Sequence, residues 1–326
     1  MATTSYAWRN VLRERVHNFV MHHKRVDMVI SPDWDGIVST VLMNHYVRQT
    51  YPTIEVQVVG TYDCKDIVTL GNGDSVAEAL FLDLDLPMDG VCHIGQHLLG
   101  QVPLSHEWSF NPNAYFQNFE TWTKYPFGTA QILFYGLFEE QDFPPIAEVL
   151  LAHADSSHSN AKRYRSNAKK WIHKMFQGDA YMKRLIDGSY FNEMLDEHLQ
   201  LVEDLHPYVK VSSKYTGKNT DRTWERCRAN QSVRGKDAQT MVKNLQYLLN
   251  YCAECFRVAC PAFKDKATTA KSIWCGRRKY YPLGQAYCAE GGIEGFLKSK
   301  SAKSHAIVNS KLVSVTLPPL DELDLE

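Results

Sequence analysis

Residues 26–46, VDMVISPDWDGIVSTVLMNHY, decide the fold. The apolar run at 26–30 predicts a strand, and the apolar residues from 37 to 47 recur at the spacing of a helix. Between them lies an acidic turn that contains Pro32 and Gly36, and a glycine there lets the backbone leave the strand tightly. The stretch therefore predicts a strand, an acidic loop and a helix in succession.

Two aspartates in this loop, Asp33 and Asp35, are candidate metal ligands. In open α/β sheets, ligands bind at the carboxyl ends of the strands, which is where this loop would lie. Two carboxylates so close together repel each other unless a cation or a proton lies between them, and hard divalent cations prefer such oxygen ligands. The structural alternative is that Asp35 caps the helix while Asp33 is solvated. The loop by itself leaves both interpretations open.

The rest of the chain alternates between the two kinds of apolar pattern. Further strands are expected at 54–60, 80–82 and 90–94. Helices are expected at 5–24, 130–139, 146–152 and 238–259. Strands alternating with helices predict an α/β fold, with a mainly parallel sheet and helices on both of its faces.

The chain of 326 residues is long enough for more than one domain. We expect a main domain over residues 1–206, then a linker and helical connection over 207–260. A smaller mixed α/β domain is expected over 261–320, followed by an acidic tail at 321–326.

Composition excludes some classes of function. The formal net charge of -1 gives no global attraction to nucleic acid or to a membrane. No apolar run approaches the ~20 residues that span a bilayer, and charges occupy the place of a signal peptide's apolar core. We therefore expect a cytoplasmic protein without a membrane partner, whose eight cysteines are reduced.

Three more polar residues follow expected elements. Asp83 ends the strand at 80–82, His97 follows the strand at 90–94, and Asp155 follows the helix at 146–152. Because parallel strands present their carboxyl ends at one edge of a sheet, we expect these side chains to converge with those of the first loop. They would then lie close enough to share a cation.

In this order the residues resemble the motifs of the DHH phosphoesterase superfamily, which includes RecJ-like exonucleases and phosphodiesterases of oligonucleotides and cyclic dinucleotides. Residues 33–39, DWDGIVS, match its first motif, Asp83 its second and Asp155 its fourth. The third motif, Asp-His-His, is degraded here to Gly95-Gln96-His97. The resemblance covers roughly residues 26–160.

The resemblance implies both a cofactor and a set of site residues. One or two Mn²⁺ or Mg²⁺ ions would be held by residues that are also the catalytic ones: Asp33, Asp35, Asp83, His97 and Asp155. Paired metals of this kind activate a water molecule and stabilise displacement at phosphorus. Contacts to the substrate would come from Ser39, Arg277, Arg278 and His305.

Two functions from different classes remain open. The first is a metal-dependent phosphoesterase that hydrolyses a phosphodiester in a nucleotide or a short single-stranded nucleic acid. The second is a catalytically degenerate protein of the same fold that binds nucleotide, nucleic acid or a partner protein without cleaving. The loss of side chains at Gly95 and Gln96 favours the second, and the intact first motif favours the first. A homo-oligomer and a larger protein complex both fit the sequence.

A basic run at residues 162–171, KRYRSNAKKW, follows Asp155 closely. Its cations could track a phosphate backbone while its aromatic side chains stack on bases. The alternative is a solvated helix face, which is the commoner reason for such a run.

Overall fold

The computed structural model describes most of the chain. The described residues are 7–63, 66–70, 76, 78–86, 90–100, 104, 106–138, 143–187, 193–209, 233, 237–263, 270–275, 277–300, 302, 304–309 and 311–317. The acidic tail expected at 321–326 lies outside them, as does much of the connection expected at 207–260. The side chain of Arg277 is also outside what the structure describes.

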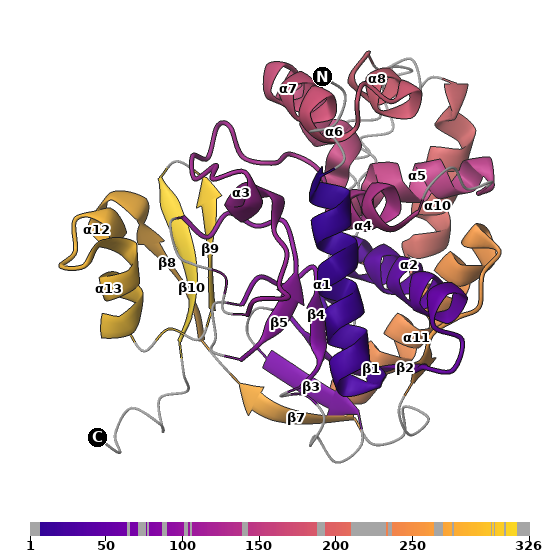
Figure 1. The fold of residues 1–326 in the computed structure, drawn as a ribbon, viewed down its shortest axis with the longest axis horizontal. Helices are drawn as coiled ribbons and strands as arrows, with labels where there is room; N and C mark the ends of the chain where they lie inside the picture. Colours follow the sequence, from indigo (N-terminus) through magenta and orange to yellow (C-terminus); the bar gives the residue numbers. More distant parts are fainter. Residues whose placement is uncertain are drawn as a thin grey trace.

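A large sheet with strand order β5-β4-β1-β2-β3-β7 forms the centre of the molecule (Figure 1). Its parallel strands are β1 (Arg25–Ile30), β2 (Glu55–Tyr62), β4 (Leu80–Leu82) and β5 (Cys92–Ile94). The short β6 (Ala262–Phe263) also pairs in parallel with β2, whereas β3 (Asp66–Leu70) and β7 (Ala270–Cys275) extend the sheet in antiparallel fashion. The chain is thus a mixed α/β protein with a mainly parallel sheet.

Most of the helices pack against one face of this sheet. The helices described over residues 7–256 are, in the order of the chain, α1 (Ala7–His23), α2 (Trp34–Thr50), α3 (Pro112–Tyr115), α4 (Thr129–Leu137), α5 (Pro145–His153), the 3₁₀ turn η1 (Ala154–Ser156), α6 (Ser157–Arg163), α7 (Arg165–Met175), α8 (Ala180–Asp187), α10 (Leu195–Leu205) and α11 (Ala238–Phe256). Alternate residues of β1, Val26, Met28 and Ile30, pack with these helices in the main core.

The sequence predicted helices on both faces of the sheet, but strand and loop residues form the described cluster on the opposite face. Val29 and Phe81 pack there with loop residues such as Leu84 and Leu86, and no described helical residue belongs to this cluster. Helices on both faces are therefore not what the described residues show. The reason is the connection from β4 to β5, which returns over residues 83–91 without a described helix.

The direction of the strand order changes at β1. The chain passes from β1 through α2 to β2 on one side, and later returns as β4 on the other side of β1. The loops that leave β1 and β4 consequently diverge, and such a switch point is where α/β sheets bind ligands. Both loops contain aspartates predicted for the site.

A small antiparallel sheet follows. It contains β8 (Arg277–Pro282), β9 (Ser304–Asn309) and β10 (Leu312–Leu317) in the order β8-β10-β9, with α12 (Leu283–Tyr287) and α13 (Gly292–Ser299) beside it (Figure 1). The Ile307 N–H donates to the Leu98 carbonyl at 2.9 Å, and Leu98 packs in this unit's own core. The small sheet is thereby attached to the segment that follows β5.

The domain boundary expected at residue 261 differs from the structure. Strands β6 and β7 pair with the large sheet, and α11 packs against α2, so the small unit begins only at β8. Short strands that complete a distant sheet through backbone hydrogen bonds have no local pattern that assigns them to it. Within the described residues, no helix is long and apolar enough to cross a membrane.

Replacing Gly36 with alanine is expected to destabilise the protein by about 1–3 kcal/mol, the usual cost of overpacking. A Cβ at this position would lie 2.2 Å from the Ser31 carbonyl oxygen and 2.8 Å from the Ser31 Cβ, so backbone would have to move. Urea denaturation measures the change. Gly284→Ala is the matched control, because its Cβ would meet nothing within 4 Å. Equal stability of the two variants would contradict the argument.

Candidate functional site

The two aspartates of the first loop have different partners. Asp33 caps α2, since its Oδ1 accepts a hydrogen bond from the Gly36 N–H at 3.1 Å. The buried carboxylate of Asp35 instead accepts the first N–H groups of α4, from Thr129 at 2.8 Å and from Ala130 at 2.9 Å. A carboxylate is favourable at a helix N-terminus, because the unpaired N–H groups and the helix dipole both attract it. Asp35 therefore links the beginnings of α2 and α4.

Asp83 reaches the same place from β4. Its buried carboxylate accepts a hydrogen bond from Thr129 Oγ1 at 3.0 Å, so Thr129 contacts both Asp35 and Asp83. The backbone of Asp83 is left-handed, with φ of 57°, and Asp155 in η1 is left-handed too, with φ of 43°. Such conformations cost roughly 1–2 kcal/mol per residue and collect at functional sites. The surrounding structure therefore imposes the position of both side chains.

The aspartates act on one another's ionisation. Burial raises the pKa of Asp83 well above its usual value, and the charges of Asp35, Asp33 and Asp155 raise it further. Burial, followed by the charges of Asp155 and Asp33, raises the pKa of Asp35 to about 7, against the effect of its two backbone hydrogen bonds. The structure therefore brings together all four of the aspartates predicted for the site.

His97 belongs to a neighbouring group centred on Asp85. The buried Asp85 carboxylate accepts hydrogen bonds from the His97 N–H at 2.8 Å and from Asn111 Nδ2 at 2.7 Å, and it lies 3.2 Å from His97 Nδ1. His93 Nε2 lies 3.6 Å from the same carboxylate. Burial alone would raise the pKa of Asp85, but the His97 hydrogen bond and the charges of His93 and His97 hold it below its usual value.

Asp85 also explains the glycine at position 95. A Cβ on Gly95 would lie 2.2 Å from Asp85 Oδ2, so the Asp85 carboxylate fills the space that a side chain at position 95 would need. Gln96 is buried, and its carbonyl accepts a hydrogen bond from Asn113 Nδ2 at 2.8 Å. The Asp85 carboxylate thus lies where a side chain at position 95 would begin. Sequence reasoning did not assign Asp85 to the site, although it lies two positions after Asp83.

A cleft at this site lies between the large sheet and the small sheet. Its volume is about 50 Å³, and its polar lining includes Asp83, Asp85 and His97 on one side and Arg278, His305, Ser314 and Thr316 on the other. Arg278 Nε donates to Ser314 Oγ at 2.7 Å. His305 is buried with Nε2 3.0 Å from the Leu99 carbonyl, and its Nδ1 has no hydrogen-bond partner among the described residues. Two predicted substrate contacts therefore face two predicted site residues.

The remaining predicted contact, Ser39, lies elsewhere. It is one turn after Asp35 on the same face of α2, but its side chain is fully buried and is not among the described residues that line the cleft. Its hydroxyl has no hydrogen-bond partner in the described part of the chain. A position in the first motif therefore does not place Ser39 against a substrate in this structure.

The acidic cluster suits a hard divalent cation in its chemistry. Carboxylate oxygens are the preferred ligands of Mg²⁺ and Mn²⁺, and a cation would offset the repulsion between buried acids. In the described part of the chain, however, no three His, Cys, Asp or Glu side chains are arranged to hold an ion. Asp35 and Asp83 are instead engaged by the beginning of α4. The structure thus shows the donors without a coordination site.

Three buried histidines, His153, His158 and His198, lie close to Asp155. His153 Nε2 lies 2.8 Å from His198 Nδ1, and the rings of His153 and His158 are 4.8 Å apart. Burial, and then the charge of His158, lowers the pKa of His198 to about 3. Because the folded-state pKa lies below the unfolded value of 6.5, the stabilising contribution of His198 is complete above pH 6.5 and is lost as the pH falls toward 3.

The free energy of unfolding should therefore fall by about 2 kcal/mol between pH 7.5 and pH 5 through His198 alone, at about 1.4 kcal/mol per pH unit. Urea denaturation at the two pH values measures this difference. The variant His198→Gln cannot take up a proton and should show a smaller difference. An unchanged pH dependence in that variant would contradict the assignment.

Comparison of the chain with protein-family models, with curated proteins and with solved structures found no match. Membership of the DHH superfamily therefore stays a prediction from the motifs quoted above. The function has to be argued from the chemistry of the cleft.

Proposed function

We propose that the chain is a DHH-like, metal-dependent phosphoesterase that hydrolyses a phosphodiester in a nucleotide or a short single-stranded nucleic acid. The supporting observation is that Asp83 and His97 line the same cleft as Arg278 and His305, although they come from different sheets. Acidic groups on one wall suit a cation, and basic groups on the other suit the anionic substrate that the cation would meet.

One or two Mn²⁺ or Mg²⁺ ions would be held by Asp33, Asp35, Asp83 and Asp155, with His97 beside them. Of these residues, Asp83 and His97 line the cleft. When bound, such an ion supplies an activated water molecule and neutralises charge on phosphoryl oxygens. The chain itself supplies buried carboxylates that repel one another, which favours cation uptake over the empty charged state. Release of Asp35 from the α4 N–H groups would be part of that uptake.

The basic wall would bind and orient the phosphodiester. The Arg278 guanidinium has one nitrogen held by Ser314, which fixes its plane and leaves further N–H donors for phosphoryl oxygens. Asp85 holds His97 Nδ1, which leaves Nε2 as the His97 ring nitrogen that can meet a substrate. Arg278 would bind and orient the phosphodiester, and His97 could hold or transfer a proton at Nε2. The role of His97 depends on Gly95 only in that the absent side chain leaves room for Asp85.

The second candidate function is binding without cleavage, by a degenerate protein of the same fold. Two observations favour it. Both oxygens of Asp35 are engaged by backbone N–H groups, and the described residues contain no group of three side chains arranged for a metal. Such a protein would bind a nucleotide, a nucleic acid or a partner protein in the cleft through Arg278 and His305.

A metal-supplemented hydrolysis screen separates these functions. Short oligonucleotides and cyclic nucleotides are incubated with Mn²⁺ or Mg²⁺ and with wild type, Asp33→Ala or Asp155→Ala, and the exposed Glu290→Ala serves as the matched control. The proposal expects hydrolysis by wild type and by the control, and its loss in the two site variants. Thermal melting with Mn²⁺ reports binding, which stabilises the folded state by about 2.7 kcal/mol at 100 times Kd.

The outcomes are distinct. If wild type melts at a higher temperature with Mn²⁺ or nucleotide but hydrolyses nothing in the screen, the binding function replaces the enzymatic one. If Asp33→Ala and Asp155→Ala hydrolyse substrates at wild-type rates, these carboxylates are not the catalytic centre and the proposal is wrong.

A further inference from the structure

A basic surface begins directly beside the candidate site. Residues 157–178 contain six lysines and arginines and no aspartate or glutamate: Lys162, Arg163, Arg165, Lys169, Lys170 and Lys174. Helices α6 and α7 carry these residues, and α6 starts immediately after η1, which contains Asp155. These helices lie together with α8 at the top of Figure 1. Because the whole chain has a formal net charge of -1, this stretch is a local concentration of positive charge.

The loop between α3 and α4 connects the cleft to this surface. Asn113 of α3 donates to the Gln96 carbonyl at 2.8 Å, and it accepts a hydrogen bond at 2.7 Å from the N–H of Tyr125, which lies in the loop. One end of the loop is therefore fixed at the degraded third motif.

The same loop is fixed to α7 further on. Asn167 Nδ2 donates to the Lys124 carbonyl at 2.7 Å, and Trp171 Nε1 donates to the Thr123 carbonyl at 2.8 Å. A short, hydrogen-bonded bridge thus leads from His97 to α7. This bridge fixes the position of the basic surface next to the cleft. A helix face that is merely solvated would not need such a connection.

A first hollow lies where the loop meets α7. Its volume is about 210 Å³, and Phe116 and Trp171 form its aromatic wall while Lys170 and Lys174 provide its cations. Lys174 Nζ is 3.9 Å from the centre of the Phe116 ring. An aromatic wall beside ammonium groups is the arrangement by which proteins bind an unpaired base together with its phosphate.

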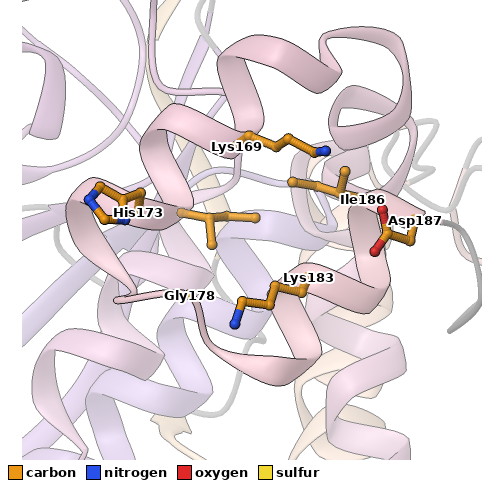
Figure 2. Close-up of a pocket in the computed structure, with 7 residues that line it drawn as sticks. Lys169, His173, Gly178, Lys183, Ile186 and Asp187 are labelled. Atoms are coloured by element: carbon orange, nitrogen blue, oxygen red, sulfur yellow. The ribbon is translucent and has the colours of Figure 1, made fainter.

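A second hollow lies across α7. Its volume is about 340 Å³, and Figure 2 shows Lys169 and His173 from α7 on one side and Lys183 from α8 on the other. Ile172 contributes apolar lining. The acid at its rim, Asp187, is paired with Arg165 at 2.8 Å. Since Lys169 and Lys170 are neighbours on α7, the two hollows follow each other across one helix, whose width is about 10–12 Å.

Exposed aromatic side chains accompany these cations. Trp122, in the bridging loop, is 64% exposed, and Tyr164, between α6 and α7, is 44% exposed. The Arg163 guanidinium lies 5.3 Å from the centre of the Tyr164 ring. Tyr164 is thus exposed beside a cation, whereas Trp122 Nε1 donates to Glu120 Oε2 at 2.7 Å. Both rings are suited to stacking on bases, because every base has a face that an aromatic ring can cover.

We infer that the α6–α7 surface, comprising α6, α7 and residues 116–124, binds the single-stranded part of a nucleic acid that extends from the phosphodiester in the cleft. This inference rests on the proposed function and narrows its substrate to a single-stranded chain longer than a dinucleotide. A single-stranded nucleic acid fits this surface because its phosphates complement the positive charges and its unpaired bases can enter the two hollows. A duplex presents its bases stacked and offers nothing to Phe116 or Trp122.

Fluorescence anisotropy with a labelled single-stranded thymidylate dodecamer tests the inference, with EDTA present so that nothing is cleaved. The variants are Lys170→Ala/Lys174→Ala and Trp122→Ala. The matched control is Lys243→Ala/Lys298→Ala, which removes the same charge from exposed positions on α11 and α13. We expect each test variant to weaken dodecamer binding about tenfold. The double lysine variant should also reduce the salt dependence, the slope of log K against log salt, by about 1.4.

Hydrolysis of a thymidylate dinucleotide with Mn²⁺ is measured on the same variants and is expected to be unchanged. If the dodecamer binds the test variants as it binds wild type, or the control loses as much affinity, the inference is overturned while the phosphoesterase can stand. Equal affinity for a duplex dodecamer, or for polyglutamate as an acidic polypeptide, also overturns it. A dinucleotide that no form of the protein hydrolyses counts against the proposed function and leaves the binding result readable.

Discussion

Asp83→Asn is expected to stabilise the metal-free protein and to abolish hydrolysis. Burial and three neighbouring acids raise the pKa of Asp83, so its stabilising contribution is complete below the unfolded value of 3.8 and is lost as the pH rises through the folded value. Asparagine has no charge to bury and can still accept the hydrogen bond from Thr129 Oγ1. We expect a gain of about 1–2 kcal/mol near pH 7.5, which disappears toward pH 4.

Asp85→Asn should have the opposite effect on stability. The pKa of Asp85 is lowered, so its contribution is present above 3.8 and is lost as the pH falls through the folded value. Loss of a charged acceptor for His97 and Asn111 should cost about 1–3 kcal/mol. Urea denaturation in EDTA measures both variants. The two substitutions would then change the free energy of unfolding in opposite directions, although the two buried aspartates are only two positions apart. A loss of stability in both variants would show that Asp83 is structural.

The first strand, loop and helix could be predicted from the sequence because all the information is local. The apolar run, the turn residues and the helical spacing in residues 26–46 agree, and β1 and α2 lie within a few residues of where they were expected. The antiparallel strands β3 and β7 could not be assigned to the large sheet in this way. Their pairing joins residues 66–70 to residues 270–275, and a short strand contains no record of its distant partner.

The site was predicted in part for the same reason. Asp33, Asp35 and Asp83 were predicted to converge because strand ends of a parallel sheet meet at one edge. Asp85 was missed because the left-handed backbone at Asp83 redirects the chain, and no local pattern reports where the next side chain then points. Ser39 was predicted from its place in a motif, whereas its burial depends on the packing of the helices around α2.

Gly95→Asp is expected to be among the most damaging substitutions in the chain, although it introduces the acid that the resemblance to the DHH motifs would place there. The new Cβ would lie 2.2 Å from Asp85 Oδ2, and the added carboxylate would be forced against an existing buried one. Overpacking and like-charge burial together should cost more than about 3 kcal/mol. In an Asp85→Ala background the space is free, and the new carboxylate can take over from the missing one.

A double-mutant cycle measures this exchange. If positions 85 and 95 share one place for a carboxylate, Gly95→Asp/Asp85→Ala should be about 2–3 kcal/mol more stable than the sum of the single changes predicts. Gly284→Asp is the control, because a side chain there meets nothing within 4 Å and should add independently to Asp85→Ala. If the effects of Gly95→Asp and Asp85→Ala on the free energy of unfolding simply add, the two carboxylates do not share one position. A large coupling would mean that a carboxylate at position 95 and the carboxylate of Asp85 compete for the same point in space.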